Sequence, residues 1–189
     1  MSHLATERLR LTPAPGGLAL VQDLLNTRQI GQHAFDLLGT VDGARYWLQQ
    51  LDPLPGNDDW PRDLTDAQLA TLRALRAAIE RLVAGGDGHT PGPLARTTLV
   101  LGSDGELRLE PAGQGLDGFA AQIWAQVFLA QLAGTWKRLK LCHNPPCASA
   151  FYDRSKNNSG VWHDVKMCGN AVNLRASRAR RRQAANGSS

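Results

Sequence analysis

Residues 136–182 read WKRLKLCHNPPCASAFYDRSKNNSGVWHDVKMCGNAVNLRASRARRR and contain all three cysteines of this 189-residue chain. Four residues separate Cys142 from Cys147, and four separate His163 from Cys168. An odd, clustered set of cysteines favours metal binding over disulfides. Structural zinc takes four sulfur or nitrogen ligands, often as two pairs at such separations. We therefore expect Cys142, Cys147, His163 and Cys168 to bind one Zn2+ ion.

Three alternatives to this site remain open. His143 competes with His163, but as the neighbour of Cys142 it would have to turn back onto the same ion, whereas His163 mirrors the spacing of the first pair. The cysteines could also be reduced and buried without a metal. A segment of about 45 residues with few large aliphatic side chains, however, needs a cross-link such as a metal ion to stay folded. A hydrolytic zinc site would keep one position open for water, and four protein ligands leave none.

The local structure of this segment is predicted to be a short hairpin followed by a helix. The hairpin arms would be residues 148–152 and 160–162, with residues 153–159 as a polar turn. The second ligand pair ends where the helix begins. The positive end of the helix dipole would then favour a thiolate at Cys168.

Charge is divided unevenly along the chain. The net charge is +4, yet residues 136–189 hold eleven Lys and Arg against two acids, and residues 1–135 hold ten against fifteen. An acidic body joined to a basic tail suggests that the tail meets a polyanion. The alternative is a solvated basic terminus that aids solubility.

The terminal helix concentrates arginine on one side. At 3.6 residues per turn, Arg175, Arg178 and Arg182 fall within an arc of about 60°, and Arg181 flanks them. Such a strip suits a phosphate-lined groove. Arginine outnumbers lysine by 17 to 4, however, and this bias of a GC-rich genome is an alternative explanation. The predicted nucleic-acid contacts are Lys156, Lys166, Arg175, Arg178, Arg181 and Arg182, with Lys137, Arg138, Lys140 and Arg154 as further candidates.

Residues 1–135 have the pattern of a mostly helical domain. Apolar spacings predict short amphipathic helices over 17–27 and 40–51, a proline-rich loop over 52–62, and a helix from the Thr65/Gln68 capping box to about residue 84. Residues 97–111 predict a hairpin that turns around 103–105. A last helix is expected over residues 116–132, with Ile123, Trp124, Val127, Phe128 and Leu132 on its buried side.

The predicted fold class is therefore α+β. A mostly helical N-terminal domain with a small β-hairpin, residues 1–135, is followed by a C-terminal zinc finger of a short hairpin plus a helix, residues 136–189.

The N-terminal region shows no convincing catalytic site. Asp23, Asp36 and Asp42 are spaced like helix caps or surface acids, and His33 and His89 have no partner at ligand spacing. No P-loop, GxGxxG or GxSxG motif occurs. We expect no catalytic residue and no enzyme activity. Because no apolar run reaches about 18 residues and the first 15 residues lack a signal-like apolar core, we expect a cytoplasmic protein without a membrane partner.

The C-terminal segment resembles the CGNR zinc-finger family of bacterial proteins. That pattern joins a Cys-x4-Cys knuckle to a Trp-Cys and to a Cys-Gly-Asn-Arg that opens an arginine-rich helix. The knuckle here is Cys142 and Cys147, the aromatic residue is Trp162, and the signature begins at Cys168. His163 stands at the third cysteine, which preserves zinc binding because imidazole is also a zinc ligand. Ala171 stands at the signature arginine, which weakens any DNA contact assigned there.

The rest of the chain resembles the ABATE-type domain. The resemblance is carried by LAL followed by Asn26-Thr27 and by DLLGTVDGARYWL at residues 36–48. Together the two resemblances imply a stress-responsive transcription regulator that binds double-stranded DNA and has an N-terminal sensor or interaction domain. A homodimer and a small-molecule or protein effector at that domain are compatible with this architecture. The rival hypotheses are a non-enzymatic adaptor whose finger binds protein or RNA, and an enzyme with its site in the N-terminal body.

Overall fold

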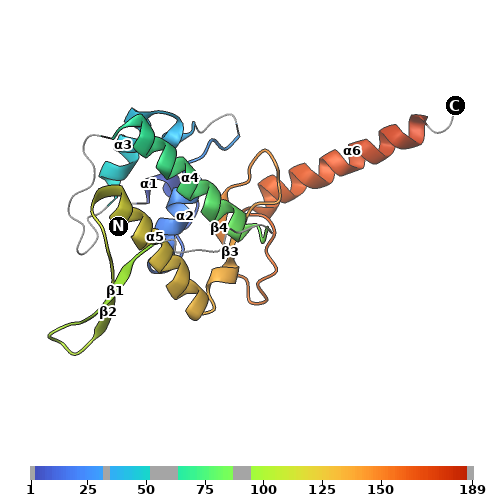
Figure 1. Ribbon diagram of the computed structural model, residues 1–189. Helices are drawn as coiled ribbons and strands as arrows, with labels where there is room; N and C mark the ends of the chain where they lie inside the picture. The colour runs from blue at the N-terminus through green and yellow to red at the C-terminus, as the bar shows by residue number, and fades with distance from the viewer. Residues whose placement is uncertain (1–2, 32–34, 52–63, 87–94, 187–189) are drawn as a thin grey trace.

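Helix α2 (Leu18–Asn26) forms the centre of the molecule, and all nine of its residues are buried. The computed structural model describes residues 3–31, 35–51, 64–86 and 95–186. Around α2 lie α1 (Leu4–Glu7), α3 (Val41–Gln50), α4 (Asp66–Val83) and α5 (Gly115–Leu132), as Figure 1 shows. Because every residue of α2 is buried, α2 lies at the centre of this group.

The helices predicted over 17–27, 40–51, 65–84 and 116–132 are confirmed as α2 to α5. The capping box at Thr65 is present, because its Oγ1 accepts from the Gln68 N–H at 3.3 Å while Gln68 Oε1 accepts from the Thr65 N–H at 2.9 Å. Thr40 caps α3 in a similar way. The proline-rich loop, His33 and His89 lie outside the described residues. No described helix is long and apolar enough to cross a membrane.

The prediction for Asp23 is wrong. This carboxylate is fully buried and accepts hydrogen bonds from the Thr6 N–H at 2.7 Å and from Trp47 Nε1 at 2.8 Å. Burial raises the pKa of Asp23, although both hydrogen bonds oppose that rise. Through these two hydrogen bonds, Asp23 of α2 connects that helix to α1 and α3. Spacing along the chain could not reveal this role, because both donors come from other helices.

The other two acids match their predictions. Asp36 caps the 3-10 helix η1 (Leu37–Gly39) by accepting from the Leu38 N–H at 2.8 Å, and it also pairs with Arg76 of α4 at 2.7 Å. Asp42 is a surface acid whose side chain pairs with Arg45, three residues along α3.

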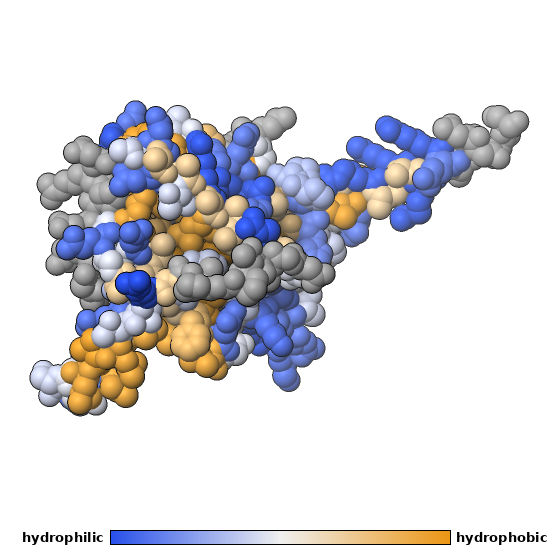
Figure 2. All heavy atoms as spheres, viewed as in Figure 1, coloured by the Kyte–Doolittle hydropathy of each residue, from blue (hydrophilic) through white to orange (hydrophobic). Residues whose placement is uncertain are grey.

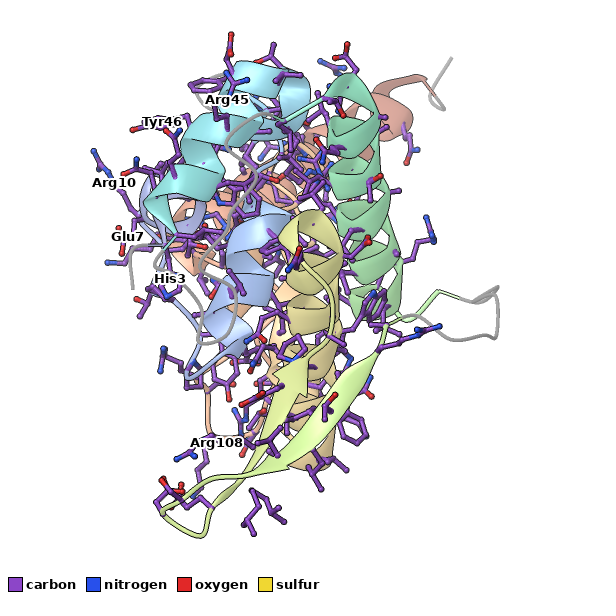
Figure 3. The ribbon with its side chains drawn as sticks, turned by 60° about the vertical axis from the view of Figure 1, so that its left-hand side comes forward. His3, Glu7, Arg10, Arg45, Tyr46 and Arg108 are labelled. Carbon is purple, nitrogen blue, oxygen red and sulfur yellow. The ribbon has the colours of Figure 1, made fainter. Side chains whose placement is uncertain are left out.

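The predicted hairpin is present as β1 (Thr97–Leu101) and β2 (Leu107–Pro111), antiparallel, with Leu99 opposite Leu109. It turns at Gly105, where φ is +81° and glycine avoids strain. The hairpin, labelled at Arg108 in Figure 3, runs beside α5, and its tip projects from the body (Figure 1).

The buried side of α5 differs from the prediction. Ile123 and Val127 are buried and Trp124 packs partly against the core, but Phe128 and Leu132 are 51% and 69% exposed. At 100° per residue, Phe128 and Leu132 lie about 140° and 180° from Ile123, so they face the other side of the helix. The prediction failed because apolar residues occur all round this helix.

The C-terminal segment consists of η2 (Trp136–Arg138), β3 (Leu139–Leu141), β4 (Ala150–Tyr152), the one-turn π-helix η3 (Val165–Gly169) and α6 (Asn170–Asn186). The predicted pairing of 148–152 with 160–162 is wrong, because β4 pairs antiparallel with β3, Leu139 opposite Tyr152. Leu139 and Ala150 are buried in the same core as the helices, and this packing selects β3 as the partner strand. Residues 160–162 make one backbone–backbone hydrogen bond to the β3 side of the turn, from the His143 N–H to the Val161 carbonyl at 3.0 Å. The α+β fold class is confirmed.

Candidate metal centre and basic helix

The first cysteine pair lies on a tight turn between β3 and β4. The N–H groups of Cys147 and Ala148 both donate to the Asn144 carbonyl, at 2.8 and 3.0 Å. Ala148 adopts a positive φ of 47°, which reverses the chain toward β4. The Cys142 N–H donates to the Ser149 carbonyl at 2.9 Å, so Cys142 continues the ladder beyond β3. The turn therefore points two cysteines into one space.

The second ligand pair surrounds the start of η3. The Asp164 side chain caps this turn by accepting from the Met167 N–H at 2.8 Å, and the Cys168 N–H donates to the Asp164 carbonyl at 2.9 Å. Gly169 lies under Trp162, since a Cβ added to Gly169 would meet Trp162 Cε3 at 3.2 Å. This contact between Trp162 and Gly169 brings their sequence neighbours, His163 and Cys168, close together.

The ligand atoms of Cys142, Cys147, His163 and Cys168 all lie within 4.8 Å of one another. His163 Nδ1 is 3.3 Å from Cys147 Sγ and 3.6 Å from Cys168 Sγ. Tetrahedral zinc, with sulfur at about 2.3 Å and nitrogen at about 2.0 Å, requires sulfur and nitrogen about 3.6 Å apart. The donor set and its spacing therefore fit zinc. His143 is not part of this group.

Two polar side chains that were not among the predicted site residues hydrogen-bond to the sulfurs. Asn144 Nδ2 donates to Cys168 Sγ at 3.2 Å, and Ser149 Oγ lies 3.1 Å from Cys147 Sγ. Such outer contacts orient metal ligands and tune their basicity. Each residue stands two positions after a knuckle cysteine, a spacing that could have identified them.

Hydrogen bonds and burial shift the pKa values of Cys147, His163 and Cys168 in different directions. Burial opposes ionisation of Cys147, but hydrogen bonds from His163 and Ser149 outweigh it and lower its pKa to about 6. The hydrogen bond to Cys147 raises the pKa of His163 to about 9. Burial raises the pKa of Cys168 to about 12. Cys147 therefore supplies a thiolate, the form that binds metal, at neutral pH.

A buried ion pair between Lys140 and Asp153 stabilises the loop that precedes His163. Asp153, only 4% exposed, accepts from Lys140 Nζ at 2.7 Å and from the N–H groups of Gly160 and Ser155 at 2.7 and 2.9 Å. Burial opposes its ionisation, but these bonds, led by the one from Lys140, hold the pKa of Asp153 well below its usual range. Lys140 is therefore a structural cation.

The sequence model of one family, described as "Putative stress-induced transcription regulator", matches residues 18–137. The chain belongs to this family, ABATE. A second family, the CGNR zinc finger, matches residues 138–181 of this ABATE protein. The finger family and the Cys3His cluster together indicate that the ABATE protein binds zinc. Neither family is an enzyme type. No curated protein matches the sequence.

Helix α6 of the ABATE protein projects away from the body (Figure 1), and hydrophilic side chains surround much of it (Figure 2). Arg178, Arg181 and Arg182 are exposed along α6. Arg175 is also exposed, but its guanidinium donates to Asn144 Oδ1, which links the first turns of α6 to the knuckle.

The remaining predicted cations divide into exposed and engaged groups. Lys156, on the loop after β4, and Lys166, in η3, are exposed. Arg138 instead donates to the carbonyls of Asp153 and Ser155, at 3.0 and 2.8 Å. Together with Lys140, it braces the finger.

The finger of the ABATE protein is bonded directly to the helical body. Asn26 of α2 accepts from the Ala150 N–H at 2.8 Å and donates to its carbonyl at 3.0 Å, while Gln22 Nε2 donates to the same carbonyl at 3.2 Å. Arg154 donates to the Pro13 carbonyl at 2.7 Å. All of these contacts join residues on either side of position 135, where the sequence predicts a domain boundary. That boundary stays a prediction.

Proposed function

We propose that this ABATE protein is a DNA-binding transcription regulator of the cytoplasm, in which a structural zinc finger presents the arginines of α6 to duplex DNA. We propose Cys142, Cys147, His163 and Cys168 as the zinc ligands. The observation that carries this proposal is the junction of an exposed arginine helix with a partly buried Cys3His cluster.

Zinc at this cluster would cross-link the knuckle between β3 and β4 to the start of α6. The chain supplies further anchors for the helix. Asn144 donates to Cys168 Sγ and accepts from Arg175, so one side chain contacts both the ligand and the helix that follows it. Among the described elements, α6 packs extensively only on η3, and its direction therefore depends on these few contacts.

The charge on α6 suits the phosphate backbone. Arg175, Arg178 and Arg182 share one side of a continuous helix, with Arg181 beside them and Lys156 and Lys166 on the finger. Ala171 lies on the same side in the first turn, so the strip begins one turn later than an arginine there would allow. Contacts of this kind position a protein on DNA without reading its sequence.

The proposal is tested by duplex binding across a series of salt concentrations. If about five cations meet phosphates, log K should fall against log salt with a slope of about −4 to −5. Replacing Arg178, Arg181 and Arg182 with Gln should reduce the magnitude of that slope by about 2 to 3. Arg180→Gln is the matched control, because Arg180 lies on the opposite side of α6 and should change the slope least.

Two outcomes would overturn the proposal. One is failure to retain duplex at low salt. The other is tighter binding of single-stranded RNA or of a protein partner than of duplex, which would favour the adaptor hypothesis.

A further inference from the structure

Helix α5 is apolar on all sides, yet one side is uncovered. Asp117 is its only charged residue. Leu116, Phe119, Ile123 and Val127 face the core. On the outer side Phe128, Leu129 and Leu132 are 51%, 42% and 69% exposed. A helix that is apolar all round is normally covered all round.

The neighbouring hairpin has a second uncovered apolar face. Its register places Leu99 opposite Leu109 and Leu101 opposite Leu107, so alternation puts all four leucines on one face. Leu99, Leu101 and Leu107 are 64%, 66% and 65% exposed. A two-stranded hairpin is only marginally stable by itself in water, and more strands or a packed face are needed to secure it.

These two faces belong to one surface. Strand β2 packs on α5, and Figure 2 shows hydrophobic side chains gathered over the hairpin and the C-terminal end of α5 in one view. Of the eleven large apolar side chains exposed among the described residues, six lie here. We call this surface the leucine face: Leu99, Leu101, Leu107, Phe128, Leu129 and Leu132. Such a concentration marks an interaction site.

We infer that the leucine face binds the leucine face of a second copy of this chain. None of its six side chains is charged, and interfaces between identical subunits are the most apolar class. The charged residues of strand β2, Arg108 and Glu110, alternate onto the other face of the hairpin, away from the leucine face.

The edge of the hairpin also suits an identical partner. Charged residues and proline are two devices that block pairing at exposed strand edges, and strand β1 has neither. Its sequence TTLVL can approach the same strand of a second copy across a two-fold axis without placing like charges together.

Dimerisation also accounts for the apolar side chains of Phe128 and Leu132 on a side of α5 that the single chain leaves exposed. Their apolar character is an adaptation to a partner that a single chain does not contain. The functional benefit of the dimer rests on the proposed function: two fingers in one assembly bind DNA more tightly than one, through avidity.

The test is the mass of the full-length, zinc-loaded chain by analytical ultracentrifugation. The wild type should sediment at twice the 20.5 kDa chain mass. Leu101→Glu on β1 and Leu132→Glu on α5 should each halve that mass. Gln49→Glu, a matched control at an exposed position of α3 outside the leucine face, should leave it unchanged. Leu132 lies on the exposed side of a packed helix, so its variant keeps the test valid if the hairpin variant unfolds.

A wild type that sediments as a single chain would overturn the inference, as would variants at Leu101 and Leu132 that remain as dimeric as the control. Duplex binding measured on the same samples separates the two proposals. A dimer that fails to bind duplex overturns the DNA-binding proposal alone. A single-chain wild type that binds duplex overturns the dimer alone.

Discussion

The helical body and the finger of this ABATE protein are held together by different means. The main core cluster contains 25 buried apolar residues among those described, all from the body except Leu139 and Ala150, whereas the second cluster, in the finger, contains four, of which three are cysteines. Stability in the body is therefore spread over many contacts, while in the finger it depends on a few ligands and hydrogen bonds. A single substitution should consequently have different effects in the two regions.

Removal of one ligand should have the largest effect. Cys147→Ser should release zinc and unfold the finger while the body stays folded, because structural zinc supplies about 10–16 kcal/mol in small fingers. Zinc content and circular dichroism measure the two parts of this expectation. The control is His143→Ala, which removes a neighbouring imidazole outside the cluster and should retain zinc. Unchanged zinc content in Cys147→Ser would contradict the ligand assignment.

A core substitution in the body should show the reverse pattern. Phe119 is fully buried against Trp47, with ring centroids 5.8 Å apart and planes at 83°. Phe119→Ala should lower the free energy of unfolding by about 3–5 kcal/mol. The folded variant should still bind zinc with wild-type stoichiometry, as urea unfolding and metal analysis would measure. Loss of zinc from the folded variant would show that the two regions are not separately stabilised.

The ion pair inside the finger makes stability depend on pH. The folded pKa of Asp153 is lowered, so its contribution is complete above the unfolded value of about 3.9 and is lost as the pH falls through the folded value. Asp153→Asn should destabilise the finger by about 2 kcal/mol at neutral pH. Urea unfolding across the pH range should show that difference shrink below about pH 4. A difference that is constant with pH would argue against the ion pair.

The bonds between body and finger should have a smaller effect. Asn26→Ala removes two hydrogen bonds to the backbone of Ala150 and should cost about 1–2 kcal/mol. Because these bonds connect the two regions, unfolding of the body and of the finger should also become less coincident by fluorescence and by zinc release. Gln49→Ala, at an exposed position of α3, should stay within about 0.5 kcal/mol of the wild type. Equal behaviour of the two variants would show that the regions are joined elsewhere.

The sequence predicted the local features well. Ligand spacing identified the four side chains that the structure brings together, and the capping box located the start of α4. The capping box and each ligand pair depend on residues no more than five positions apart, where chain geometry limits the possible arrangements.

The errors concern contacts between distant segments. Strand β4 pairs with β3 because Leu139 and Ala150 are buried against the helices of the body. The finger sequence alone does not contain those helices. Asp23 is satisfied by donors from two other helices. In α5, Phe128 and Leu132 are as apolar as its buried residues, so composition could not distinguish the side that faces the core.

The central claim is that three sulfurs and one imidazole nitrogen bind a single zinc ion at the base of α6. X-ray absorption at the zinc edge of the purified protein tests it most directly. We expect three sulfur neighbours at about 2.3 Å and one nitrogen at about 2.0 Å, with one zinc per chain. A folded protein without zinc, or a first shell made mainly of oxygen and nitrogen, would contradict the account.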